Sequence, residues 1–392
     1  MASITFGGGC LAFPSAMKSL GWAMALILFL VVAIFSYYTL VILMQSGIRK
    51  KTYNYNGLIE LSMGSKMVWF SDINNLILCM GVIMSYQKFI YSFATDILDA
   101  FFGVDKNDKL IQISIILFCF LFIQIPLTLL RKIAYLQYVS ILGSFALIYS
   151  IIVILSETYT KHNISIKTYE IVAFEKFGWD YVNSMAIYLF GFCSHNGMFQ
   201  VFIELNRPSK NRYAKILNRS FLLEIVLYLS IGFSGYFSFL GATTDNILSN
   251  YDIDDKFILV SKISLFICLH CSMAINYNIM RASYESILLK PGEKKFTFFK
   301  DLLLSVFTLF ICNVFVYFVD SVSKILGIFG GISTVVISYF NPIMIYVLTN
   351  NHSRFSAYNL FAYFVLIITS LVGIVSTGYS LVDFVLTLMK KK

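Results

Sequence analysis

Hydrophobic residues recur along this chain in long runs that short polar segments separate. A helix needs about 20 apolar residues to cross the hydrocarbon core of a bilayer. On this criterion the pattern predicts eleven transmembrane helices within one domain that occupies residues 1–392. The expected spans cover residues 1–18, 22–46, 70–101, 111–130, 133–156, 183–203, 219–240, 257–282, 301–319, 324–349 and 356–388. The long polar connections 157–182 and 283–300 are expected to leave the membrane.

Two of these spans carry residues that interrupt a helix. Residues 6–14 read FGGGCLAFP, and residues 189–198 read LFGFCSHNGM. Glycine costs about 1 kcal/mol in a helix interior and proline about 3 kcal/mol. Non-helical backbone inside a membrane survives only where protein buries it or where it lines a polar cavity. A pair of broken helices in matching halves indicates the substrate site of a transporter.

The two breaks divide the chain into repeats. The first repeat covers about 1–156 and the second about 183–349, with five expected spans in each and an extra helix at about 356–388. An odd number of spans turns the second repeat upside down relative to the first. Inverted repeats of this kind place the site near the bilayer midplane, between the halves.

Composition supports a membrane protein. The chain is 58% hydrophobic, 17% aromatic and 13% charged, with a mean hydropathy of +0.77. Soluble domains carry about 25% charged residues. The net charge of +9 comes from basic residues in short loops, not on one face, so the bilayer and not nucleic acid is the expected partner. All seven cysteines lie in expected spans, which argues against a disulfide framework.

The distribution of lysine and arginine predicts the orientation. Most basic residues fall in alternate loops that carry few acids, beginning with Arg49, Lys50 and Lys51. Cytoplasmic loops are enriched in Lys and Arg, so these loops are expected to face the cytoplasm. The opposite loops contain most of the acids, such as Asp252 and Asp254.

Several segments resemble one known family. Residues 7–18 resemble the first-span motif of the amino acid/auxin permease family. Residues 126–140 look like the junction of the fourth and fifth spans in its sodium-coupled neutral amino-acid transporter branch. Residues 194–196 and 204–210 are similar to its sixth span and the following basic loop. The resemblance implies a LeuT-like fold of eleven helices that moves amino acids together with a cation.

The resemblance leaves the coupling ion open. In the sodium-coupled branch an asparagine precedes the first-span glycines by about four residues, and this chain has Ser3 nearest that place. Both H⁺ and Na⁺ therefore remain candidates. Apart from a co-transported cation, no cofactor is expected.

The first break is expected to bind the substrate carboxylate. The N–H groups at the start of a half-helix carry about half a positive charge together. We assign binding of the carboxylate to the backbone N–H groups around five residues. These are Gly7, Gly8, Gly9, Cys10 and Leu11. The alternative is that the glycines only allow close helix packing.

The second break is expected to face the same pocket through Phe190, Cys193, Ser194 and His195, with Tyr86 from the third span. Carbonyl groups there could take the substrate ammonium. His195 titrates near neutral pH and is a candidate for a coupling proton, or it hydrogen-bonds a neighbouring helix. The uncharged aromatic lining favours a neutral amino acid.

Ion coupling is assigned to polar groups within the spans. Lys88 lies inside the third span, where a charge is costly. It could stand in for a bound sodium ion, pair with Asp96, or extend to the membrane surface. Ser272 and Asn276 in the eighth span offer uncharged oxygen ligands, and Ser3 is the remaining candidate.

No nucleophile–base pair or phosphate-binding loop is evident, so an enzyme is not expected. The cysteine–histidine cluster at 268–271 is not expected to hold a metal, because a structural zinc site needs four ligands. The sequence predicts cation-coupled amino-acid transport by alternating access in a monomer. The predicted location is the plasma membrane or the vacuolar or lysosomal membrane. The competing hypothesis is an amino-acid sensor that does not transport.

Overall fold

The structure is a computed structural model. It describes residues 8–106, 108–131, 133–203, 205, 209–289, 293, 295–319, 321–350, 353 and 355–390. In this part of the chain all regular secondary structure is helical. Nine helical segments among the described residues are long and apolar enough to cross a membrane. The predicted class, an all-helical multi-pass membrane protein, is confirmed.

Seven spans are continuous α-helices. They are α3 (Trp22–Lys50), α5 (Ser65–Phe102), α8 (Ile133–Ser165), α11 (Lys210–Phe239), α12 (Lys256–Leu288), α13 (Phe298–Phe318) and α17 (Ala357–Lys390). Two spans contain π-helical turns. The first comprises α6 (Lys109–Phe118), η2 (Cys119–Gln124) and α7 (Ile125–Thr128); the second comprises α14 (Val322–Ile325), η5 (Leu326–Gly330), α15 (Gly331–Val335), η6 (Val336–Phe340) and α16 (Asn341–Thr349).

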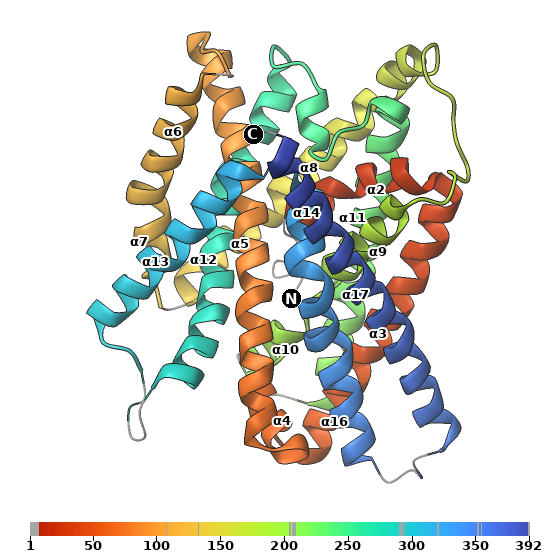
Figure 1. The fold of residues 1–392 in the computed structure, drawn as a ribbon, viewed down its shortest axis with the longest axis vertical. Helices are drawn as coiled ribbons and strands as arrows, with labels where there is room; N and C mark the ends of the chain where they lie inside the picture. Colours follow the sequence, from red (N-terminus) through yellow and green to blue (C-terminus); the bar gives the residue numbers. More distant parts are fainter. Residues whose placement is uncertain are drawn as a thin grey trace.

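Shorter helices form the interrupted segments and the connections. They are η1 (Gly8–Ala12), α2 (Phe13–Leu20), α4 (Tyr55–Met63), α9 (Trp179–Gly191), α10 (His195–Ile203), η3 (Leu240–Ala242) and η4 (Ile247–Asn250). Neither α2 nor α9 is long enough to cross the hydrocarbon core alone. Both lie in the interior of the bundle, where α2 packs against α9 and α11 (Figure 1).

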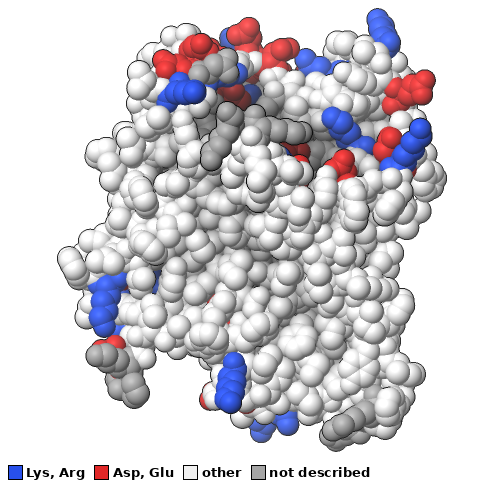
Figure 2. Space-filling view, in the orientation of Figure 1, with Lys and Arg blue, Asp and Glu red and all other residues white. Residues whose placement is uncertain are grey.

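The molecule has two ends that differ in charge. At the end that the sequence predicts to be cytoplasmic, named the inner end, α3 ends at Lys50 and α16 ends at Thr349. At the opposite end, named the outer end, α5 ends at Phe102 and α8 at Ser165. In Figure 2 the Asp and Glu side chains on the visible face gather mostly at the upper, outer end. The lower end shows mainly Lys and Arg and is the end that the sequence predicts to be cytoplasmic.

A close backbone contact fixes the corner between α2 and α3. Gly21 has φ of +79°, and a Cβ atom there would lie 2.6 Å from the carbonyl oxygen of Ala173. The N–H of Trp22 donates to the carbonyl of Val172 at 3.1 Å, and the N–H of Glu175 donates to that of Leu20 at 3.0 Å. The loop after α8 therefore lies against this corner.

The predicted boundaries differ from the structure in instructive ways. Helix α8 continues nine residues beyond its predicted end at 156, and α5 begins five residues before 70. Helix α4 and the π-helical turns were not predicted. A hydropathy criterion measures the hydrocarbon thickness, so it does not detect helix that extends beyond it or a local change of winding inside a span.

Candidate functional site

The second predicted break is present. Helix α9 ends at Gly191, and α10 begins at His195. Between them the N–H of Phe192 donates to Tyr188 at 3.3 Å and that of Cys193 to Phe190 at 3.0 Å, both to carbonyl oxygens. The last carbonyl groups of α9 and the first N–H groups of α10 therefore meet in the interior of the protein.

The stretch that the sequence predicts as the first break is described from Gly8 onward. Gly8–Ala12 is a 3₁₀ helix that continues directly into an α-helix, which begins at Phe13 with Pro14 in its first turn. The first N–H groups of a 3₁₀ helix have no partner within that helix. Gly7 and Ser3 lie outside the described residues.

Glycine brings the two breaks together. A Cβ atom on Gly9 would lie 3.6 Å from Cδ1 of Phe190, so the backbone of η1 runs directly beside the end of α9. Cys10 and Leu11 are buried. Thus four predicted residues from two distant stretches of sequence form one buried region.

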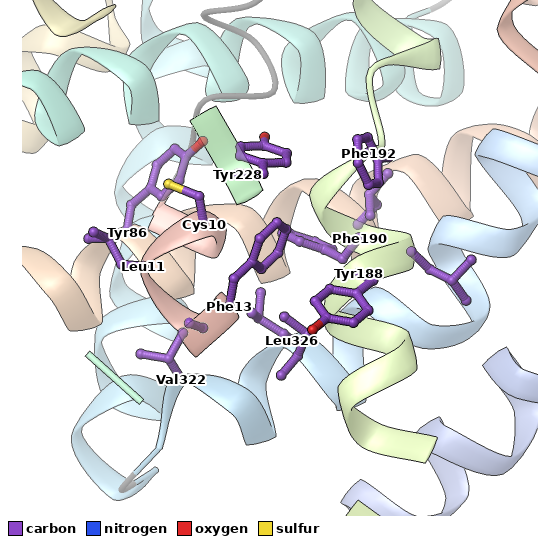
Figure 3. Close-up of a cluster of buried hydrophobic side chains, with 14 of the residues drawn as sticks. Cys10, Leu11, Phe13, Tyr86, Tyr188, Phe190, Phe192, Tyr228, Val322 and Leu326 are labelled. Carbon is purple, nitrogen blue, oxygen red and sulfur yellow. The ribbon is translucent and has the colours of Figure 1, made fainter. Parts of the chain in front are cut away.

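A polar group faces η1 from the opposite side. Tyr86 of α5 lies beside Cys10 (Figure 3), and Asn276 of α12 is near the Tyr86 hydroxyl. The side-chain amide of Asn276 donates to the carbonyl of Ser272 at 3.0 Å. Predicted substrate and ion residues therefore adjoin one another here.

His195 lies on a different side of the break. Its Nε2 atom is 2.9 Å from the Thr39 hydroxyl oxygen of α3. That hydroxyl also lies within hydrogen-bonding distance of the carbonyl oxygens of Phe35 and Ser36, and when it donates to one of them, Nε2 is the donor to Thr39. Nδ1 then carries a lone pair, and it has no hydrogen-bond partner among the described residues.

The neighbours of His195 share this orientation. Cys193 accepts a hydrogen bond from the hydroxyl of Ser338 at 3.0 Å, and Ser194 is buried. The structure therefore separates the predicted pocket residues into two groups. Tyr86 and Phe190 adjoin η1, which contains Cys10, while Cys193 and His195 face α3 and η6.

An aromatic cluster packs between α2, α9 and α11, next to the end of α9. The ring of Phe13 makes edge-on contacts with Tyr188 and Tyr228, at centroid distances of 5.2 and 4.8 Å (Figure 3). The hydroxyl of Tyr228 donates to the carbonyl of Gly191 at 3.1 Å. This bond satisfies one of the carbonyl groups left without a helical partner at the end of α9.

Polar cavities lie on both sides of the breaks. An outer cleft of about 480 Å³ lies between α2, α9, α14 and α17 and reaches Ser15 and Ile187. An inner cavity of about 190 Å³ includes Asn75 and Asn196, whose side chains are hydrogen-bonded at 2.9 Å. Buried residues of η1 and the α9–α10 break lie between the two.

Lys88 does not adjoin the breaks. Two residues along an α-helix correspond to about 200° of rotation, so Lys88 and Tyr86 occupy opposite faces of α5. The amine of Lys88 donates to the carbonyl of Val319 at 2.7 Å, at the C-terminal end of α13. A cation is favoured at that end of a helix dipole. Asp96 pairs instead with Lys262 and Lys106, each at 2.7 Å.

Two groups of buried ion pairs were not predicted from the sequence. Lys262 of α12 is only 1% exposed, and its position inside a predicted span was a usable signal. At the inner end Asp301 accepts from Arg281 at 2.8 Å and from Arg131 at 2.9 Å. The partners are far apart in sequence, so no local pattern could pair them.

Comparison with known proteins gives a consistent result. A sequence profile described as transmembrane amino acid transporter protein matches residues 1–383. Vacuolar amino acid transporter 7 of Saccharomyces cerevisiae is 28% identical over 292 residues, which cover 72% of this chain and 57% of that protein. Sodium-coupled neutral amino acid symporter 2 of Danio rerio is 23% identical over 413 residues, covering 98% and 81%.

An AAT1 protein of Plasmodium falciparum is 29% identical over 285 residues, covering 72% of this chain and 45% of that protein. The chain thus spans about half the length of some curated relatives that it matches. Among solved structures, a Na⁺-coupled sialic acid symporter in a substrate-bound outward-open state overlaps with a TM-score of 0.45 at 13% identity, covering 96% of this chain and 90% of that one.

Proposed function

Because this chain belongs to the transmembrane amino acid transporter protein family, we propose that it is a secondary active transporter of amino acids. The observation that carries the proposal is the buried meeting of η1 with the α9–α10 break, between polar cavities at opposite ends. A substrate site that lies between two such cavities can open to each side in turn. The same arrangement is the general design of transporters with broken helices.

The substrate is held by backbone groups. The N–H groups of η1 bind its carboxylate, because the start of a helix carries partial positive charge. The last carbonyl groups of α9 and the hydroxyl of Tyr86 bind its ammonium group. A zwitterion thereby receives both signs of partial charge without a charged side chain.

The substrate is a neutral amino acid. The side chains beside η1 are Cys10, Tyr86, Phe190 and Asn276, none of which is charged at neutral pH. A substrate with a charged side chain would require a compensating charge in this buried region.

Transport is coupled to H⁺ or Na⁺. Ser272 and Asn276 offer oxygen atoms next to the substrate region, and His195, whose Nδ1 has no hydrogen-bond partner among the described residues, can take a proton. One positive charge moving down 100 mV releases about 2.3 kcal/mol, and a tenfold gradient adds about 1.4 kcal/mol. Together they sustain accumulation of about 500-fold, so no nucleotide is required.

Uptake by proteoliposomes tests the proposal. The full chain is reconstituted and presented with radiolabelled neutral, acidic and basic amino acids, with an imposed gradient of H⁺, of Na⁺, or of neither. We expect accumulation of at least one neutral amino acid that one of the gradients increases. Binding of an amino acid to the purified protein without uptake under any gradient would instead support a sensor.

A further inference from the structure

The outer cleft contains side chains of both charges. Lys18 of α2, Lys324 of α14 and Asp383 of α17 line it, together with Asp180 and Asp245. Its volume of about 480 Å³ falls within the range of small-molecule pockets, roughly 300–1,000 Å³. Hydroxyl and amide groups, including Ser184 and Asn183, complete the lining.

One pair of charges in the cleft is already neutralised. Lys324 and Asp383 form an ion pair at 2.9 Å, and the amine of Lys324 also donates to the Thr387 hydroxyl at 2.8 Å. The carboxylate of Asp180 accepts a hydrogen bond from the Tyr379 hydroxyl at 3.3 Å. The charges of Lys324 and Asp383 are therefore compensated by each other. Asp180 has no ion pair among the described residues, but its hydrogen bond with Tyr379 makes it a weaker candidate for a ligand than a carboxylate with no partner at all.

Lys18 and Asp245 are different. The amine of Lys18 donates to the carbonyl of Thr243 at 3.1 Å and has no acidic partner among the described residues. Asp245 is half-buried. Its carboxylate forms neither an ion pair nor a hydrogen bond with any residue that the structure describes. The cleft therefore presents one amine and one carboxylate that do not pair with each other.

The cleft is also close to the breaks. Its residue Ser15 lies four positions after Leu11, about 6 Å along a helix, and Ile187 lies three positions before Phe190, about 4.5 Å. The polar cleft and the buried substrate region are thus about one helical turn apart. A molecule held in the cleft is next to the groups that would receive it.

We propose that the outer cleft is a second binding site for a zwitterionic amino acid, in which Lys18 binds the carboxylate and Asp245 the ammonium group. The substrate stops here before it reaches the breaks. A zwitterion fits because it carries both charges on one small molecule, whereas a simple anion or cation would satisfy only one of the two groups. The inference rests on the proposed transport function and adds a site and two recognition residues to it.

Four variants test the site. Lys18→Gln and Asp245→Asn each remove one charge, and Lys18→Arg keeps the charge of Lys18. Lys167→Gln is the matched control, because Lys167 is an exposed residue just beyond α8 that does not line the cleft. The probe is the radiolabelled neutral amino acid with the highest uptake by the unmodified protein. Its competitors are the corresponding amine without the carboxylate and the corresponding acid without the amino group.

We expect Lys18→Gln and Asp245→Asn to raise KM from the outer side about five- to tenfold, as expected for the loss of one charge-assisted hydrogen bond. Vmax and the KM for efflux from the inner side should stay within twofold. Lys18→Gln should weaken competition by the acid that lacks the amino group but not competition by the amine. Asp245→Asn should weaken competition by the amine that lacks the carboxylate but not competition by the acid. Lys18→Arg should restore the KM, and Lys167→Gln should leave it unchanged.

The crossed pattern separates recognition from a structural effect, since a distorted loop would weaken both competitors equally. Equal weakening of both competitors, or a KM for Lys18→Gln and Asp245→Asn no higher than that of Lys167→Gln, would overturn the second site while leaving transport intact. If the unmodified protein shows no uptake, the proposed function fails and this inference fails with it.

Discussion

The ring of Phe13 lies against the backbone of Gly191, where an added Cβ atom would come within 2.5 Å of its Cζ atom. Phe13 begins α2 directly after η1, and Gly191 ends α9 before the α9–α10 break. The two segments therefore touch at a position where only a hydrogen atom fits. The contact also fixes the position of the end of α9 against α2.

Gly191→Ala is expected to destabilise the protein by about 1–3 kcal/mol, because the surrounding rings leave Phe13 no space to move. The midpoint of thermal unfolding in detergent measures the effect. Gly378→Ala on α17 is the control, since a Cβ atom there meets nothing within 4 Å. Adding Phe13→Leu should recover part of the loss; if Gly191→Ala unfolds at the same temperature as Gly378→Ala, the close contact has no energetic weight.

Gly9→Ala separates a packing glycine from a substrate-binding one. The new Cβ atom would lie at ordinary contact distance from Phe190, 3.6 Å, so the variant should fold with an unchanged unfolding midpoint. It should nevertheless lower kcat/KM for uptake about tenfold or more, because the methyl group occupies space next to the N–H groups of η1. Unchanged uptake in a folded Gly9→Ala protein would argue that the glycine serves packing alone.

The buried pair of Asp96 and Lys262 should respond asymmetrically to substitution. Asp96→Asn leaves the amine of Lys262, 1% exposed, without a charged partner, and should cost about 3–5 kcal/mol. Lys262→Met should cost less, since Asp96 keeps Lys106 at 2.7 Å. When Lys262 is already Met, Asp96→Asn should lower the free energy of unfolding by at least about 1 kcal/mol less than it does in the unmodified protein. Additive shifts in the unfolding midpoint would contradict this coupling.

Tyr86 and Lys88 form a second matched pair, on opposite faces of α5. Tyr86→Phe should raise KM several-fold with little loss of stability, because its hydroxyl lies beside η1 and Asn276. Lys88→Met should lower stability by about 1 kcal/mol through loss of its bond at the end of α13 and leave KM unchanged. A change in the number of cations moved per amino acid by Lys88→Met would restore a role for Lys88 in coupling.

Much of the architecture followed from local sequence. The apolar runs predicted the continuous spans. Gly191 and the polar residues that follow it, Ser194 to Asn196, predicted the break between α9 and α10. These predictions succeed because crossing a bilayer demands about 20 apolar residues and because glycine and proline disfavour helix at any position. Neighbouring residues alone decide both effects.

The grouping of the site residues could not be obtained in the same way. Tyr86 and Lys88 are both polar residues of one span, and only the packing of α5 against α12 and α13 shows that they face different neighbours. Likewise His195 and Phe190 flank one break but point toward different helices.

The sequence by itself determined that this chain is a multi-pass helical membrane protein with interrupted segments, because hydropathy and backbone propensity act over a few residues. Tertiary structure alone decided that Gly9 adjoins Phe190, that Lys262 neutralises Asp96, and that Lys18 and Asp245 share a cleft. Such pairs depend on how helices distant in sequence rotate and pack against one another. A helix presents a different residue about every 100°, so its sequence does not specify which face meets which partner.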